Sequence, residues 1–172
     1  MSEKHLTRDE RHWEEVEDAA ERLQQHDIEG ALLALRDVLT NDPENPYAFD
    51  LLGTALFEAR KFAEAADAYR AAVRHAPDFL GARVGLSHAL RASGDAKGAL
   101  ESAKAGLARF PKDGELQHAS GLAHAALGER GAAKKELEGF LASKPEFEAQ
   151  TEVRQILEML GLGKEGDPVE FE

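Results

Sequence analysis

Apolar residues recur along this chain every three or four positions, the spacing that places them on one face of an α-helix. In residues 46–59 the pattern runs through Phe49, Leu52 and Leu56. It breaks at a polar stretch and resumes over residues 62–75. Over the whole chain, the pattern predicts helices at residues 8–25, 28–40, 46–59, 62–75, 80–92, 96–109, 114–126, 130–142 and 148–160.

The residues at the helix ends are ones that start and stop helices. Asn45 is a good N-cap, since its side chain can accept hydrogen bonds from the first free backbone N–H groups. Pro46 suits the first helical position, where its missing N–H is not needed. Pro77 ends the second helix, because proline cannot continue one. Residues 46–79 are therefore predicted to form one unit of two helices joined by a short turn.

Several residue types recur at a constant step of 34 residues, which indicates an internal repeat. One coincident pair of prolines would mean little, but several series in a single phase indicate true repetition. Each proline of the first series closes a pair of predicted helices. The two clearest series are Pro43, Pro77, Pro111 and Pro145, and Ala31, Ala65, Ala99 and Ala133.

These helical pairs resemble the units of the tetratricopeptide repeat family. That pattern has a bulky residue, a Leu-Gly step, a large residue, a small one and an aromatic, and it closes on proline. Residues 46–79 match almost all of it, and the first unit matches only in its second helix. The matching residues are Phe49, Leu52, Gly53, Leu56, Ala65, Tyr69, Ala72 and Pro77, then Leu86, Leu90, Gly94, Ala99 and Pro111, then Gly121, Gly128, Ala133 and Pro145, and in the first unit Ala31, Leu35, Val38 and Pro43.

The resemblance implies an all-α fold, a right-handed superhelical stack of helix-turn-helix repeats closed by a C-terminal capping helix. We expect one array over residues 1–160, followed by a flexible acidic tail over residues 161–172. The capping helix, 148–160, has a clear apolar stripe. The repeats are 12–45, 46–79, 80–113 and 114–147, and the stripe is Ala149, Val153, Ile156, Leu157 and Leu160.

The first helix of the first repeat departs from the pattern. Its expected packing positions hold charged residues, and its apolar stripe runs instead through Trp13, Val16, Ala20 and Leu23. Two interpretations remain open. Either the helix is rotated as an N-terminal cap, since terminal repeats are commonly atypical, or it exposes an apolar seam.

Composition narrows the function. Aromatic residues make up only 6% and alanine is frequent, which suits closely packed helices better than sheets. The formal net charge of −12 disfavours nucleic acid and anionic membrane surfaces as partners. The chain contains no Cys, so disulfides and thiolate metal sites are excluded. Its start has no apolar signal region and no run is long enough for a membrane helix, so we expect a cytoplasmic protein.

Three short motifs resemble cofactor, nucleophile or metal sites, but none has the sequence context that such a site requires. Gly161, Gly163 and Gly166 match a dinucleotide loop, but a helix precedes them instead of a strand. Ser87 lies in the middle of a helix, which favours packing over a nucleophilic role. His88 and His118 lie on consecutive first helices, yet a zinc site normally needs three or four ligands. We therefore predict no enzyme activity, no cofactor and no metal.

In this family the first helices of successive repeats line a concave groove, and the resemblance implies a protein or peptide ligand there. Tyr47 and Phe57 are large aromatics at positions that face the groove, so each either anchors a ligand or packs on a neighbouring helix. Gly81 and Gly85 leave room for something to approach closely. The predicted partner-binding groove comprises Tyr47, Asp50, Leu51, Thr54, Phe57, Gly81, Val84, Gly85, His88, Arg91, Glu115, His118 and Leu122.

The predicted function is that of an adaptor, scaffold or assembly chaperone that holds a segment of another protein. Some family members grip the terminal carboxylate of heat-shock chaperones with Lys, Asn and Arg. The matching positions here cannot do so, since they hold Val16, Ala20, Leu51, Gly81 and Gly85. Two alternatives stay open: a self-associating scaffold that forms a homo-oligomer, and a chaperone of the type that serves type III secretion translocators.

Overall fold

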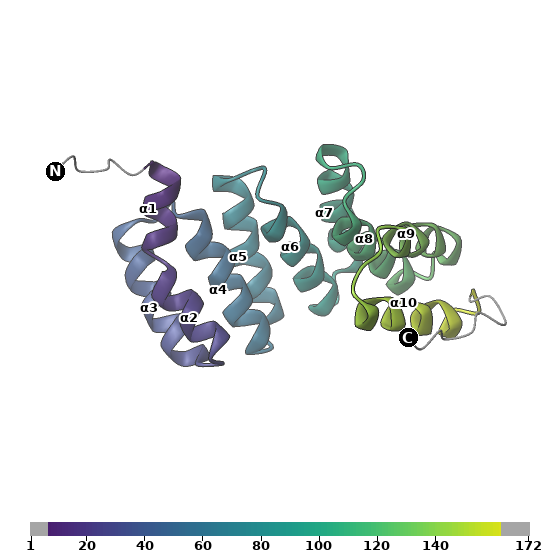
Figure 1. Cartoon of the computed structure of the whole chain (residues 1–172), viewed down its shortest axis with the longest axis horizontal. Helices are drawn as coiled ribbons and strands as arrows, with labels where there is room; N and C mark the ends of the chain where they lie inside the picture. The colour runs from purple at the N-terminus through teal and green to yellow at the C-terminus, as the bar shows by residue number, and fades with distance from the viewer. Residues whose placement is uncertain (1–6, 163–172) are drawn as a thin grey trace. The chain divides into compact units, whose positions relative to one another are not determined.

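The computed structural model describes residues 7–162, and within that range the chain forms ten helices and no strand (Figure 1). These helices fall into two compact units, Met1–Asp95 and Ala96–Glu172. We call them unit 1 and unit 2 and describe each by itself. The expectation of one array over residues 1–160 stays a prediction. Most of the predicted tail, residues 163–172, lies outside the described residues.

Unit 1 contains six helices, and α4 is the most central of them. It packs against α3, α5 and α6, and it also touches α1 and α2. The pairs α2–α3 and α4–α5 are the first two repeats, and α6 begins the third. The helices are α1 (Arg8–Glu14), α2 (Glu17–Gln24), α3 (Ile28–Asn41), α4 (Pro46–Glu58), α5 (Phe62–His75) and α6 (Leu80–Ala92).

Unit 2 contains four helices. Helix α8 packs against both α7 and α9, and α10 packs on α9. The last of them is the predicted capping helix, and Val153 and Leu157 of its stripe are buried against Leu137 and Phe140 of α9. The helices are α7 (Ala96–Arg109), α8 (Gly114–Ala126), α9 (Arg130–Ala142) and α10 (Phe147–Met159).

The helix bounds agree closely with those predicted, with one correction. The single helix expected over residues 8–25 is broken at Glu15 and Val16 into α1 and α2. At the break, the N–H of Val16 donates to the carbonyl oxygen of Trp13 at 3.1 Å, a tighter turn than an α-helix makes. The break turns the Val16 side chain fully inward.

The turn between the two helices of a repeat has the same geometry all four times. One residue adopts a left-handed conformation, and the N–H after it bonds back five residues to close the helix end. In the second repeat, for example, the N–H of Lys61 donates to the carbonyl oxygen of Leu56 at 2.8 Å. Glycine tolerates this conformation best, but only two of the four turns have it. The left-handed residues are His26, Arg60, Gly94 and Gly128.

Small residues let the helices approach closely. The alanines of the repeat series, at positions 31, 65, 99 and 133, are all 0% exposed. The Tyr69 ring of α5 lies against the backbones of Gly53 and Gly85, where an added Cβ would lie only 2.7 Å and 2.5 Å from it. The space that we expected Gly85 to leave for a partner is therefore filled by Tyr69.

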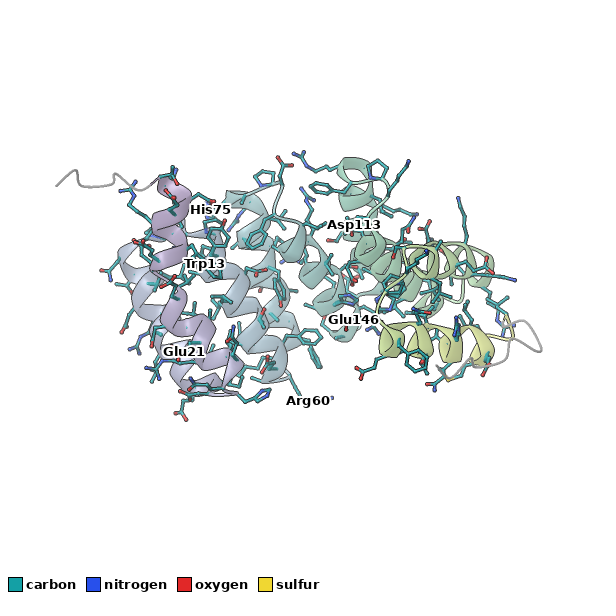
Figure 2. The ribbon with its side chains drawn as sticks, in the orientation of Figure 1. Trp13, Glu21, Arg60, His75, Asp113 and Glu146 are labelled. Carbon is teal, nitrogen blue, oxygen red and sulfur yellow. The ribbon has the colours of Figure 1, made fainter. Side chains whose placement is uncertain are left out.

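Side-chain burial decides between the two interpretations of the first helix of the first repeat, a rotated cap or an exposed apolar seam. Val16, Ala19 and Leu23 are buried against α3 and α4. The helix is thus rotated as a cap and does not expose a continuous apolar seam. Trp13 of α1, labelled in Figure 2, is the exception. Its side chain remains partly accessible to solvent, with 46% of the residue exposed.

Candidate partner-binding surface

Ten of the predicted groove residues lie on two neighbouring helices of unit 1, α4 and α6, and eight of these ten share one surface. These eight occupy equivalent positions of successive repeats, 34 residues apart, and are spaced so that each set lies on one side of its helix. Helices α4 and α6 are in contact, so the two sets adjoin. We call this surface the α4–α6 face: it comprises Tyr47, Asp50, Thr54 and Phe57 on α4, and Gly81, Val84, His88 and Arg91 on α6.

Tyr47 is half-buried between two other aromatic rings. Its ring meets Trp13 and Phe79 edge to face, with centroids 5.6 Å and 5.3 Å away. Its hydroxyl donates a hydrogen bond to Asp9 Oδ1 at 2.8 Å. This bond to a carboxylate raises the pKa of Tyr47, with a smaller effect of burial. Tyr47 thus packs on neighbouring elements and still reaches the surface.

Beside Tyr47 the structure forms an open pocket of about 500 Å³. Tyr47 and Gly81 were expected at this surface, whereas the other lining residues were not. Phe79 lies in the connection between α5 and α6, directly before α6 begins. Asp9 lines the pocket only because the tertiary fold places α1 beside it. The lining residues are Asp9, Pro46, Tyr47, Ala76, Pro77, Asp78, Phe79, Leu80 and Gly81.

Helix α1 is held at this pocket by polar contacts. Asn45, fully buried, donates through Nδ2 to the carbonyl oxygen of His12 at 2.9 Å and to Glu15 Oε2 at 3.1 Å. The same side chain caps α4, as predicted, because its Oδ1 accepts from the N–H groups of Tyr47 and Ala48, each at 3.1 Å. His12 Nε2 lies 2.9 Å from Asp42 Oδ2. These contacts set the position of α1, and with it Asp9.

Asp50 lies one turn along α4 from Tyr47. Its carboxylate has no hydrogen-bond or ion-pair partner within residues 7–162, and partial burial raises its pKa to about 6. The neighbouring Thr54 hydroxyl lies 3.0 Å from that of Tyr69. Burial raises the pKa of Tyr69 to about 12. The carboxylate of Asp50 is thus half-buried and unpaired within the described residues, which lowers the stability of the fold.

Other predicted residues of unit 1 have internal contacts. Phe57 packs on Phe62 of α5 with ring centroids 5.0 Å apart, which favours the packing interpretation for this aromatic. Leu51 packs against the apolar clusters that α2 and α3 form with α4. The Nε of Arg91 is buried without a hydrogen-bond partner within the part of the chain that the structure describes.

The three predicted residues of α8 belong to unit 2. Glu115 is exposed. The His118 ring stacks on Phe140, with centroids 4.6 Å apart, and Leu122 packs against the apolar cluster of α9 and α10. His118 and Leu122 therefore contribute to the packing of their own repeat.

Two further observations concern other kinds of site. Between residues 7 and 162, no group of three or more His, Cys, Asp or Glu side chains is placed to hold a metal ion. In the same range, no helix is both long and apolar enough to cross a membrane.

Comparison with known proteins identifies the fold. Two models described as tetratricopeptide repeat match residues 18–78 and 56–123. The chain belongs to the tetratricopeptide repeat family. The predicted family and all-α class are thus confirmed. A search of curated proteins found no sequence match.

Several solved structures are similar over most of the chain. TTC0263 of Thermus thermophilus has a TM-score of 0.74 and 22% identity, covering 88% of this chain and 84% of that one. PilW, a type IV pilus biogenesis factor, has a TM-score of 0.77 and 20% identity, covering 91% and 72%. A MamA protein has a TM-score of 0.72 and 20% identity, covering 88% and 83%. At these identities, the likeness is one of fold.

Proposed function

We propose that this protein binds an extended or helical segment of a partner protein along the α4–α6 face. Tetratricopeptide repeat folds serve as protein interaction modules, which is the general support for this proposal. The observation that carries it is local: half-buried aromatic, apolar and charged side chains adjoin on this face, and Asp50 among them lacks a partner within the described residues. Buried aromatic anchors dominate many protein interfaces. We further propose that the protein is cytoplasmic and has no catalytic role.

The experiment is selection of displayed 12-residue peptides on the full-length protein, followed by mapping of the bound peptide through amide chemical shifts. We expect shifts concentrated in α4 and α6. Val84→Arg places a large charged side chain on the face and should weaken binding at least tenfold. Leu33→Arg is the matched control, because Leu33 is 50% exposed on α3, outside the face.

Each variant is checked for folding by its urea unfolding midpoint, because Val84 is half-buried. Peptides that bind Val84→Arg as tightly as the wild type, or shifts confined to other helices, contradict the proposal.

A second candidate function is self-association. It is favoured by Phe147 and Met159 of α10, which are 54% and 77% exposed. Light scattering over a hundredfold concentration range separates the two functions: a constant monomer mass excludes self-association, and a rising mass that Met159→Lys abolishes supports it.

A further inference from the structure

The pocket beside Tyr47 has apolar walls. The Tyr47 and Phe79 rings lie at 64° to one another, and the other apolar side chains of the lining are Pro46, Ala76, Pro77 and Leu80. Gly81 contributes no side chain, and an added Cβ there would lie 3.4 Å from the Phe79 ring. A narrow aliphatic chain is the kind of group that such walls accommodate.

The polar side chains of the pocket are acidic. Asp9 and Asp78 both line it, and no basic residue does. Asp9 accepts the Tyr47 hydroxyl at Oδ1, but a carboxylate can accept several hydrogen bonds, so Asp9 keeps capacity for a cation. Arg83, on the neighbouring helix turn, already donates to the Pro77 carbonyl oxygen at 2.7 Å.

We infer that this pocket receives a basic side chain, lysine or arginine, from the partner segment. The aliphatic stem would lie along the exposed surfaces of the Tyr47 and Phe79 rings, which are themselves in contact. The charged head would meet the Asp9 carboxylate and would also be attracted by the nearby aromatic faces. The chain's net charge of −12 favours approach of a basic segment. This inference rests on the proposed function and names the partner chemistry.

The protein carries its own reporter for the test. Trp13 is the only tryptophan, and its ring meets Tyr47 edge to face, so its fluorescence should change when the pocket fills. The probes are Nα-acetyl-argininamide and Nα-acetyl-lysinamide, with the neutral arginine analogue Nα-acetyl-citrullinamide and Nα-acetyl-prolinamide as comparisons. We expect saturable binding of both basic probes, at least tenfold tighter than of citrullinamide. Equal binding of citrullinamide, or tighter binding of prolinamide, overturns the inference.

Three variants test the assignment. Asp9→Asn should weaken argininamide binding at least fivefold, while Asp37→Asn, an exposed aspartate on α3, should leave it unchanged. Gly81→Leu should fill the pocket and abolish probe binding without lowering the urea midpoint, because Gly81 is exposed and leucine favours helices. Undiminished probe binding to Gly81→Leu overturns the inference.

The inference and the proposed function can fail separately. Selected peptides that bind the α4–α6 face without any basic residue, together with no binding of argininamide, overturn only the inference. Argininamide binding that Gly81→Leu abolishes, with peptides that bind Val84→Arg normally, supports the pocket and contradicts the face.

Discussion

The helices at the two ends of the chain are held by different forces. Helix α1, before the first repeat, is attached mainly by polar contacts, among them the buried Asn45 amide and the His12–Asp42 pair. Helix α10, after the last repeat, is attached by apolar burial of Val153 and Leu157. The two interhelix turns share their geometry but differ in the residue at the left-handed position, which is His26 in the first repeat and Gly128 in the fourth.

The kind of attachment indicates the structural role of each terminal helix. Apolar burial tolerates small shifts, so α10 only needs to cover the last repeat. Hydrogen bonds require defined geometry, so the polar contacts place α1, with Trp13 and Asp9, in a set position beside Tyr47. A helix of seven residues would not form alone. The first end is therefore both a cap and part of the candidate pocket.

The largest effect is expected at the apolar end. Leu157→Ala should lower the free energy of unfolding of unit 2 by about 2–5 kcal/mol, because it leaves a cavity in the buried cluster. Met159→Ala, in the same helix but 77% exposed, should change it by less than about 0.5 kcal/mol. Urea unfolding measures both, and hydrogen exchange should show the loss in α9 and α10 only. Equal effects of the two variants would contradict the apolar attachment of α10.

The next effect concerns the polar end. Asn45→Ala should cost roughly 2–3 kcal/mol, since it removes the cap of α4 and leaves buried groups of α1 and α4 unpaired. Asp113→Ala is the control: Asp113 caps α8 by accepting from the N–H of Leu116 at 2.9 Å and has no second role in these contacts. It should cost about 1 kcal/mol. Denaturant unfolding that gives both variants the same loss would show that Asn45 does not hold α1.

Asp50 gives the chain a pH dependence in unit 1. Its pKa is raised in the fold, from 3.8 to about 6, so the folded state binds a proton more readily than the unfolded state. Its contribution to stability is full below pH 4 and is lost as pH rises through 6. Asp50→Asn should therefore match the wild type near pH 4 and exceed it at pH 7 by about 1–2 kcal/mol. Urea unfolding at several pH values tests this, and a constant difference between the two proteins would contradict it.

The smallest expected change in stability comes from substitutions in the interhelix turns of the first and fourth repeats. His26→Gly should stabilise the fold by about 0.5–1 kcal/mol, because φ is 59° there and glycine adopts such values without strain. Gly128→Ala should destabilise it by about 1 kcal/mol, since φ is 75°. Thermal unfolding of the pair should give shifts of opposite sign, and shifts of the same sign would refute this interpretation of the turns.

Much of the fold could be predicted because its signals are local and repeated. The helix bounds follow from apolar periodicity, and the cap at Asn45 and the ends near Pro43 and Pro77 follow from backbone chemistry. The break at Val16 could not be predicted, since it depends on how the first helix meets α3 and α4. Of the residues that line the candidate pocket, Tyr47 and Gly81 could be predicted from the sequence, because they occupy equivalent positions of successive repeats.

The amino-acid sequence by itself determined the family, the 34-residue repeat and the place of nearly every helix, because each of these depends on neighbours in the chain. Only the tertiary structure decided that Tyr69 fills the space at Gly85 and that Asp50 is partly removed from water. It also decided that the Tyr47 hydroxyl bonds to Asp9, 38 residues away in the chain. The physical reason is that burial and hydrogen bonding depend on distances between helices. Those distances follow from how every side chain packs, which no local pattern specifies.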